Sequence, residues 1–305
     1  MSLFSRFVVL TLPLIPRLIV GKIARRYVAG ETREEALRVA QALSSRGAMA
    51  TLDLLGEEVS ERHRAAEAVE EYIRLFDAIN ETGAIEGSGF DANVSIKLTL
   101  LGLKIDASFC RDNVERIALA AKKYGNFLRL DMEDRSTTDG TLRIYRDLQG
   151  RLGNLGVVLQ SYMRRTLRDI DELPAEGANV RLCKGIYIEP RRVAWKGLET
   201  VRRNYVAALE KLIRREIYVG IATHDEYLVC AAVELLDRYS VPTDRYEFQM
   251  LLGVDEELRN TLLDGGHRLR VYIPYGRDWY QYSVRRLREN PEIARHVARA
   301  MFGLR

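Results

Sequence analysis

Short apolar segments alternate with longer segments of helical periodicity along most of the chain. The apolar segments are rich in β-branched residues and nearly continuous, which is typical of strands that are covered on both faces. Eight of them are predicted to be strands, at residues 48–55, 94–99, 127–133, 156–162, 179–185, 217–224, 246–251 and 269–274.

Between these strands, apolar residues recur at the three- and four-residue spacing of amphipathic helices. The first helix is predicted at residues 31–46, where Thr32 caps it and Ala36, Leu37, Ala40 and Leu43 form its apolar stripe. Further helices are predicted at residues 62–79, 112–123, 139–152, 166–173, 192–215 and 255–264, together with one that ends near residue 239.

Eight strand–helix units in about 260 residues match the size of a closed (βα)8 barrel. An open, doubly wound sheet is the alternative, but no glycine-rich phosphate-binding motif follows any predicted strand. We therefore predict an α/β fold with two parts. Residues 1–46 form an N-terminal helical arm, and residues 47–305 form a TIM-like (βα)8 barrel whose final helix lies over the barrel mouth.

Composition narrows the class of protein. The chain has 305 residues, 47% of them hydrophobic and 30% charged, with a net charge of +4 that is not gathered into a basic block. A nucleic-acid partner is therefore not expected. Three cysteines, Cys110, Cys183 and Cys230, lie far apart and form no CxxC pair, which indicates a reducing cytoplasm and no zinc site.

The apolar segment at residues 7–21 is interrupted by Pro13, Pro16 and Arg17 and is shorter than a membrane-spanning helix. Two interpretations stay open. It packs on the rest of the protein or on a second chain of a homo-oligomer, or it makes a peripheral contact with a membrane.

Polar residues recur where the predicted strands end. They are Lys97, Thr99, Asp131, Glu133, Gln160, Arg181, Lys184, Thr223, His224, Gln249 and Tyr272. Because the active sites of (βα)8 barrels lie at the C-terminal ends of the strands, we expect these side chains to line a functional site. We expect such polar residues to gather at these ends rather than at the strand starts.

The residue types favour one kind of chemistry. A single histidine at this end argues against a His-rich metal centre, and no Ser or Cys stands beside a His as in acyl-transfer enzymes. Cations and hydrogen-bond donors dominate. They suit a phosphate-bearing cofactor and a carboxylate substrate, with the difficult chemistry left to the cofactor.

The last predicted helix begins at Asp278 and ends before Pro291. Its residues Tyr282, Arg285, Arg286 and Glu289 share one face because they are spaced at i, i+3, i+4 and i+7. Two arginines on one face can clamp a carboxylate or phosphate through paired N–H donors. The alternative is a solvated surface helix with Arg–Glu pairs.

Several motifs occur in an order that resembles the proline dehydrogenase family. They are RRYVAGET, ATLDLLGE, VSIKLT, LRLDMED, VVLQSY, VRLCKGIY, ATHDEY, YEFQMLLG, RVYIPYG and YSVRRLREN. The chain is most similar to the short, bacterial, single-function form of that family, from about residue 25 onwards. The resemblance implies a distorted barrel that holds FAD non-covalently in a cytoplasmic enzyme. It also implies oxidation of L-proline to Δ1-pyrroline-5-carboxylate by hydride transfer to flavin N5, with electrons passed to a quinone at the inner face of the membrane.

The resemblance also implies roles for individual residues. The substrate carboxylate is expected to bind Arg285, Arg286 and Lys97, and the proline ring is expected to pack against Tyr272 and Leu251. Residues with expected catalytic roles are Asp131, Arg181 and Lys97, with Asp131 holding Lys97 in place and Arg181 stabilising the reduced flavin.

For FAD the implied binding residues are Met132, Gln160, Arg181, Lys184, Gly185, Ile186, Thr223, His224 and Glu289. One of them departs from the family pattern, since the family usually has a small alanine where this chain has Ile186. The larger side chain raises the question of whether the flavin fits there.

Three other functions are consistent with a polar barrel mouth. The first is a Schiff-base aldolase with Lys97 or Lys184 as the nucleophile. The second is another flavin-dependent barrel, such as a folate reductase with a nicotinamide partner. The third is a scaffold whose charges form only salt bridges. Flavin absorbance that responds to proline distinguishes a proline dehydrogenase from all three.

Overall fold

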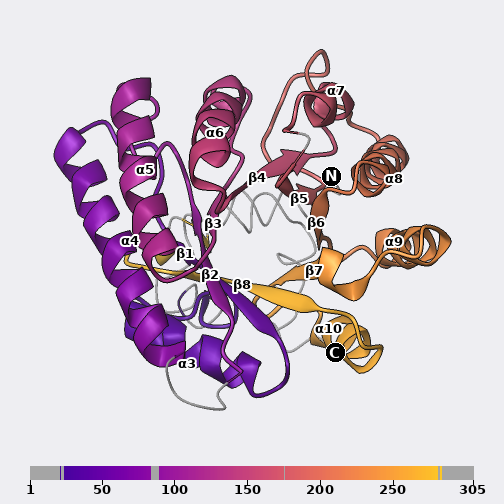
Figure 1. Ribbon diagram of the computed structural model, residues 1–305, viewed down its shortest axis with the longest axis horizontal. Helices are drawn as coiled ribbons and strands as arrows, with labels where there is room; N and C mark the ends of the chain where they lie inside the picture. The colour runs from indigo at the N-terminus through magenta and orange to yellow at the C-terminus, as the bar shows by residue number, and fades with distance from the viewer. Residues whose placement is uncertain (1–20, 22–23, 84–88, 175, 281, 284–305) are drawn as a thin grey trace.

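Eight parallel strands pair in chain order and close into a barrel, because β8 also pairs with β1. The computed structural model describes residues 21, 24–83, 89–174, 176–280 and 282–283, and Figure 1 looks down the barrel. The strands are β1 (Met49–Leu54), β2 (Ala92–Ile96), β3 (Leu128–Leu130), β4 (Leu155–Gln160), β5 (Asn179–Cys183), β6 (Tyr218–Ala222), β7 (Tyr246–Leu251) and β8 (Leu269–Tyr275). Each overlaps a segment predicted to be a strand, so the predicted fold class is confirmed.

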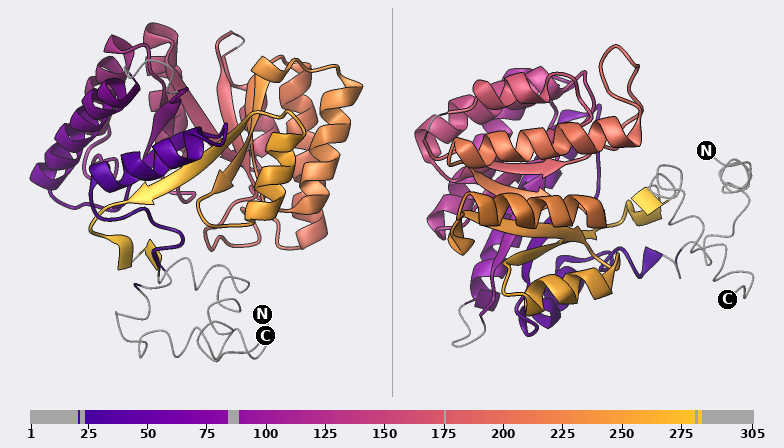
Figure 2. Two further views of the ribbon diagram at one scale, coloured as in Figure 1. Left: turned by 90° about the horizontal axis from the view of Figure 1, so that it is seen from below. Right: turned by 90° about the vertical axis from the view of Figure 1, so that its right-hand side faces the viewer.

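Helices surround the barrel on its outer side, as Figures 1 and 2 show. They are α3 (Arg33–Ser44), α4 (Arg62–Gly83), α5 (Ala107–Lys123), α6 (Thr138–Leu152), α7 (Thr166–Asp171), α8 (Leu198–Arg214), α9 (Glu226–Arg238) and α10 (Glu256–Asp264), with the 3₁₀ helix η2 (Thr243–Arg245) before β7. The helices and the outer faces of the strands enclose one continuous apolar core.

Two helices differ from their predicted bounds. The α5 helix begins at Ala107 rather than at residue 112, because the Asp106 side chain caps it by accepting a hydrogen bond from the Phe109 N–H at 2.7 Å. The α8 helix begins at Leu198 rather than at residue 192. The Pro190 carbonyl instead accepts hydrogen bonds from the next turn, and Ala194 pairs with Met163 in an isolated bridge.

The α3 helix precedes the barrel and is capped by Thr32 as predicted, in a capping box with Glu35. Its buried residues are the four of the predicted stripe. It packs against β1 and β8 on their outer side. In a regular (βα)8 barrel the helix that follows β8 occupies that position. Because α3 already fills it, the chain that leaves β8 must take another course.

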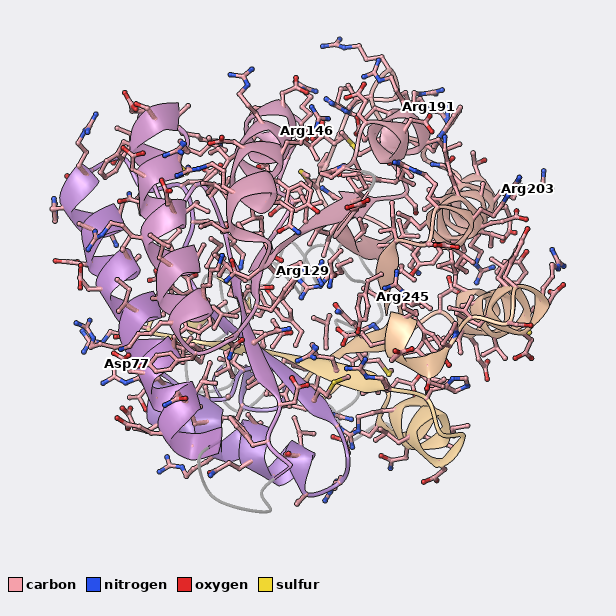
Figure 3. The ribbon with its side chains drawn as sticks, viewed as in Figure 1. Asp77, Arg129, Arg146, Arg191, Arg203 and Arg245 are labelled. Atoms are coloured by element: carbon pink, nitrogen blue, oxygen red, sulfur yellow. The ribbon has the colours of Figure 1, made fainter. Side chains whose placement is uncertain are left out.

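The barrel interior is polar along its length, which the sequence did not lead us to expect. Arg129, Glu247 and Arg270 are buried at the starts of β3, β7 and β8, and Figure 3 shows Arg129 inside the ring of strands. The prediction that polar residues avoid the strand starts was therefore wrong. These residues are tolerated because they bond to one another or to backbone carbonyls, and because Gly156 leaves room for Arg129.

Residues 1–20 of the predicted N-terminal arm lie outside the described part of the chain. Within the described ranges, no helix is both long and apolar enough to cross a membrane. The three cysteines all have free thiols.

Candidate active site

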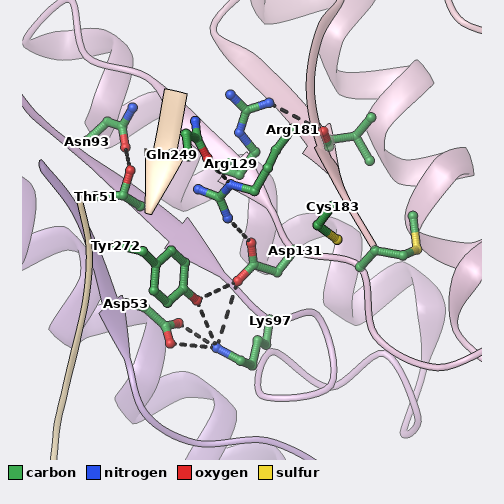
Figure 4. A network of polar contacts seen from close by, with 12 residues as sticks. Thr51, Asp53, Asn93, Lys97, Arg129, Asp131, Arg181, Cys183, Gln249 and Tyr272 are labelled. Atoms are coloured by element: carbon green, nitrogen blue, oxygen red, sulfur yellow. Dashed lines mark hydrogen bonds and ion pairs between the residues drawn. The ribbon is translucent and has the colours of Figure 1, made fainter. Parts of the chain in front are cut away.

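Lys97 directly follows β2, and its ammonium lies inside the C-terminal half of the barrel. Its Nζ lies 2.6 Å and 2.7 Å from the two carboxylate oxygens of Asp53, on the neighbouring strand β1. The Oδ2 of Asp131 is more distant, at 3.9 Å. Asp131 was predicted to hold Lys97. In the structure Asp53 makes the close contacts, and Asp131 is a secondary partner (Figure 4).

Asp131 connects three strands at this end of the barrel. Its Oδ1 accepts a hydrogen bond from Arg181 Nη1 on β5 at 2.7 Å, and its Oδ2 accepts one from the Tyr272 hydroxyl on β8 at 2.7 Å. The Arg181 guanidinium also stacks over the Tyr272 ring, 5.1 Å from its centre. The structure thus brings together Lys97, Asp131, Arg181 and Tyr272, which the sequence had grouped (Figure 4).

The charges of this cluster follow from its burial. Burial by itself lowers the pKa of Lys97, but the negative charges of Asp53 and Asp131 outweigh that effect, so its pKa is raised and the ammonium form is favoured. Burial, with Asp131 and Asp53, raises the pKa of Tyr272 well above its ordinary value. Tyr272 therefore remains a neutral phenol that donates a hydrogen bond to Asp131.

A second polar cluster lies after β5 and β6. Lys184 Nζ lies 3.1 Å from Asp225 Oδ2, and Arg202 binds both oxygens of the same carboxylate. Burial raises the pKa of Asp225, but the hydrogen bonds from Arg202 and Lys184 outweigh it and lower the pKa overall. Beside them, Thr223 Oγ1 accepts from the Asp225 N–H, and His224 Nε2 accepts from the Leu251 N–H at 2.9 Å.

The Lys-Gly-Ile loop after β5 makes one close backbone approach. Gly185 has φ +103°, and a Cβ at this position would lie 2.1 Å from the Tyr162 ring, so a side chain is excluded there. The next residue, Ile186, is 41% exposed. The larger side chain of Ile186 is therefore accommodated at the protein surface.

Gln160 at the end of β4 has an acceptor that the described part of the chain leaves unpaired. Its Nε2 donates to the Glu133 carbonyl at 2.8 Å and weakly to the Met132 carbonyl, while its Oε1 is buried without a hydrogen-bond partner. An unpaired buried acceptor destabilises a protein by roughly 1–3 kcal/mol. A ligand N–H at this strand end would satisfy it.

A cavity of about 130 Å³ lies beside Lys97. Leu55, Gly56, Glu57, Arg64, Lys97, Asp278 and Tyr282 line it. A larger hollow of about 590 Å³ adjoins it and is lined by residues of β1, α3, α4 and the segment after β8, but not by Lys97, Asp53 or Asp131. We assign the site to the smaller cavity, because only it reaches Lys97.

The start of the last predicted helix lies at this cavity. Trp279, Tyr280, Tyr282 and Ser283 are helical, and Tyr282 packs against Val28 and Leu55. The predicted site residues Arg285, Arg286 and Glu289 lie outside the described residues.

One residue of the cluster was missed from the sequence, and the contact of a second was not predicted. Asp53 was read as part of a uniform apolar strand, although an acid two positions after Thr51 in such a strand faces the same side. Gln249 at the end of β7 was expected to line the site, but the hydrogen bond that it accepts from Arg181 Nε was not predicted.

Comparison with known proteins gives a consistent picture. Residues 36–299 match the family model described as proline dehydrogenase. The chain is 38% identical to a proline dehydrogenase from Deinococcus radiodurans, covering 92% of this chain and 90% of that protein. It is 33% identical to proline dehydrogenase 1 from Bacillus subtilis, covering 91% and 90%.

Among solved structures, proline utilization A (PutA) from Bdellovibrio bacteriovorus, inactivated by N-propargylglycine, superimposes with a TM-score of 0.81 at 24% identity. The matched region covers 87% of this chain and 32% of that protein. This likeness concerns the fold.

Proposed function

The chain belongs to the proline dehydrogenase family, whose members are flavin-dependent enzymes that oxidise proline to pyrroline-5-carboxylate, and from that premise we propose where its substrate and cofactor bind. L-Proline binds in the cavity beside Lys97, and FAD binds across the ends of β4, β5 and β6. The observation that carries this proposal is Asp131, which joins the proposed substrate cation Lys97 to the proposed flavin cation Arg181.

The residues at the strand ends fit FAD. The unpaired Gln160 Oε1 is an acceptor suited to an N–H on the flavin pyrimidine edge, and Lys184 supplies a cation for its phosphates. Gly185 keeps the backbone after β5 close to Tyr162, and Thr223, His224 and Met132 complete the expected set, with Glu289. When bound, FAD supplies a hydride acceptor at N5 and the connection to a membrane quinone.

The protein's own groups prepare the substrate. Lys97, held as an ammonium by Asp53, binds the proline carboxylate together with Arg285 and Arg286. The positive charges around the site lower the pKa of the proline amine, because like charges disfavour its protonated form. A neutral amine has the lone pair that hydride departure requires. No general base of the enzyme is needed.

The course of the chain after β8 supports the arginine clamp. The outer position beside β8 is filled by α3, and Tyr282 lines the same cavity as Lys97. On a continued helix, Arg285 and Arg286 come one turn after Tyr282 on its own face. We propose that both guanidinium groups reach the substrate, and that residues 278–290 cross the barrel mouth.

A Schiff-base aldolase is less well supported. A nucleophilic lysine must lose its proton, whereas Asp53 and Asp131 raise the pKa of Lys97.

The decisive experiment is a visible spectrum of the purified protein before and after anaerobic L-proline. We expect a flavin band that bleaches with proline and returns when a soluble quinone is added. A colourless protein that forms a borohydride-trapped adduct on Lys97 would contradict the proposal and support the aldolase.

The clamp is tested separately with Arg286→Met. We expect affinity for a proline analogue that keeps the carboxylate to fall by roughly tenfold or more, because a charge-assisted hydrogen bond is lost. Arg288→Met is the matched control, since on a continued helix Arg288 lies roughly 120° around the axis from Tyr282. Unchanged affinity in Arg286→Met would remove Arg286 from the site.

A further inference from the structure

We propose that Gln249 is a positioning residue that fixes the guanidinium of Arg181 in the barrel, and that Gly220 exists to make room for it. Arg181 has a role in the proposed function, so this inference rests on that proposal. It concerns a residue that lies behind Arg181, on the side away from Asp131.

Arg181 is held from two sides. Its Nη1 donates to Asp131 Oδ1 at 2.7 Å, and its Nε donates to Gln249 Oε1 at 2.5 Å (Figure 4). One hydrogen bond lets a planar guanidinium pivot, whereas two bonds at different nitrogens define its plane. With the Tyr272 ring stacked against it at 5.1 Å, the guanidinium has one orientation.

Gln249 is itself fixed by a buried carboxylate. Its Nε2 donates to Glu247 Oε1 at 2.5 Å. Glu247 in turn accepts from Arg270 Nε at 2.9 Å and from the Tyr218 hydroxyl at 2.9 Å. Arg181 can only donate and the Glu247 carboxylate only accepts here, so the amide of Gln249 cannot turn over without facing its N–H groups toward Arg181 and its oxygen toward Glu247. Glu247, which lies closer to the start of β7, therefore fixes the orientation of the Gln249 amide.

Gly220 explains how this amide fits inside the barrel. In the strand register Gly220 on β6 lies beside Arg181 on β5 and beside Glu247 on β7. A Cβ at Gly220 would lie 2.4 Å from Gln249 Nε2 and 2.8 Å from its Cδ. The Gln249 side chain thus occupies the space that the missing side chain leaves. The φ angle of Gly220 is not in the left-handed region, so the backbone conformation does not require glycine there. Glycine is needed to leave space for the Gln249 amide.

The orientation of the Arg181 guanidinium matters for the proposed reaction. A cation stabilises charge that develops on the reduced flavin only when its N–H groups already point there. The hydrogen bonds that Gln249 makes in the structure are to Arg181 and Glu247, whereas the proposed substrate cation is Lys97. Gln249 acts by preventing Arg181 from turning, so its loss should affect the flavin more than proline binding.

The test uses two variants that disturb Arg181 in different ways. Gln249→Met keeps the length of the side chain but removes the acceptor. Gly220→Ala keeps every hydrogen-bonding atom and displaces the amide. The matched control is Gln149→Met. Gln149 is another buried glutamine, but it lies on α6, outside the barrel, where its side chain binds the Leu155 N–H and the Gly177 carbonyl.

We measure kcat and KM for proline, and the midpoint potential of the bound flavin by dye-coupled reduction. For Gln249→Met and Gly220→Ala we expect kcat to fall roughly three- to tenfold, by the loss of one hydrogen bond. We expect KM to change less and the potential to shift to more negative values. We expect Gln149→Met to keep the wild-type potential even if it unfolds more easily.

A folded Gln249→Met protein with the wild-type kcat and potential would overturn the inference. If Gly220→Ala does not fold, Gln249→Met alone decides. If the wild-type protein itself holds no flavin that proline bleaches, the proposed function fails first, and the role of Gln249 fails with it. The two failures are thus told apart by the wild-type spectrum.

Discussion

Lys97 is enclosed by two carboxylates at unequal distances, 2.6 Å to Asp53 and 3.9 Å to Asp131. Removing the closer one leaves a buried ammonium without a short ion pair. Because breaking a buried pair destabilises a protein by roughly 3–5 kcal/mol, we expect Asp53→Asn to lower the free energy of unfolding by about that amount. Urea unfolding at neutral pH measures it.

A double-mutant cycle with Lys97→Met supplies the control. The double variant buries neither charge, so it should be more stable than Asp53→Asn alone. If Asp53→Asn unfolds at the wild-type urea concentration, the pair is not what holds Lys97.

Arg129 illustrates a different solution for a buried cation. Its Nη2 bonds to the Asn179 side chain at 2.6 Å and its Nη1 to the Asn179 carbonyl at 3.0 Å. Burial and the charge of Arg181 lower its pKa to about 9. The guanidinium fits only because Gly156 has no side chain: a Cβ there would lie 2.5 Å from Nη1 and 2.8 Å from the Asn179 carbonyl oxygen.

We therefore expect Gly156→Ala to destabilise the protein by roughly 1–3 kcal/mol through overpacking, as measured by chemical denaturation. Gly150→Ala is the matched control, since Gly150 lies in α6 with nothing within 4 Å of its added Cβ. That variant should be stabilised by roughly 0.5–1 kcal/mol. Equal effects of the two substitutions would contradict the packing argument.

Single residues of the site were predictable where chemistry repeats at strand ends. Lys97, Asp131, Arg181 and Tyr272 were found in this way, and the structure does bring them together. Asp53 was not found, because its strand is otherwise apolar and was interpreted as a buried strand without site residues. Hydrogen-bond partners such as Gln249 and Arg181 depend on strand register, which the sequence pattern does not specify.

At the scale of elements, α3 depends on its first turn. Thr32 Oγ1 accepts from the Glu35 N–H, and Glu35 accepts from the N–H groups of Thr32 and Glu31. Thr32→Ala removes one half of this capping box. We expect a loss of about 1 kcal/mol in the free energy of unfolding, and almost none for Thr32→Ser, which keeps the hydroxyl. Equal losses in both variants would mean that the methyl group, not the cap, matters.

The elements themselves were largely predictable because period and capping agree. The four buried residues of α3 were those of the predicted stripe. Boundaries failed where a local side chain decided them, as Asp106 does at α5. The position of α3 beside β1 and β8 was not predictable, because the helical pattern shows which face is buried but not against which strand.

At the scale of the whole molecule, one chain of polar contacts runs through the barrel. It leads from Arg270 through Glu247, Gln249 and Arg181 to Asp131. The barrel interior therefore serves both as core and as support for the site, since the groups at the mouth are oriented by groups at the strand starts. From the strand ends alone, only the involvement of Gln249, Arg181 and Asp131 could be anticipated. Glu247 and Arg270 lie at the strand starts, where no site residues were expected.

The Glu247–Arg270 pair at the strand starts should make the stability of the protein depend on pH. Burial alone raises the pKa of Glu247, but Arg270, whose Nε lies 2.9 Å away, outweighs burial and lowers the pKa below the ordinary value of 4.5. A carboxylate with a lowered folded-state pKa stabilises the protein above its unfolded-state pKa, and this contribution is lost as the pH falls through the folded-state value.

We therefore expect Glu247→Gln to be less stable than wild type by roughly 3 kcal/mol at pH 7, where Arg270 loses its buried partner. The difference should shrink as the pH falls below 4.5, because the unfolded wild-type chain then binds a proton at Glu247 that the folded protein, with its lower pKa, does not yet bind. Urea unfolding from pH 7 down to about pH 3 measures it. Glu234→Gln, which breaks an exposed pair with Arg238, should show no such dependence. A constant difference for Glu247→Gln across this range would mean that the charge of Glu247 does not stabilise the barrel.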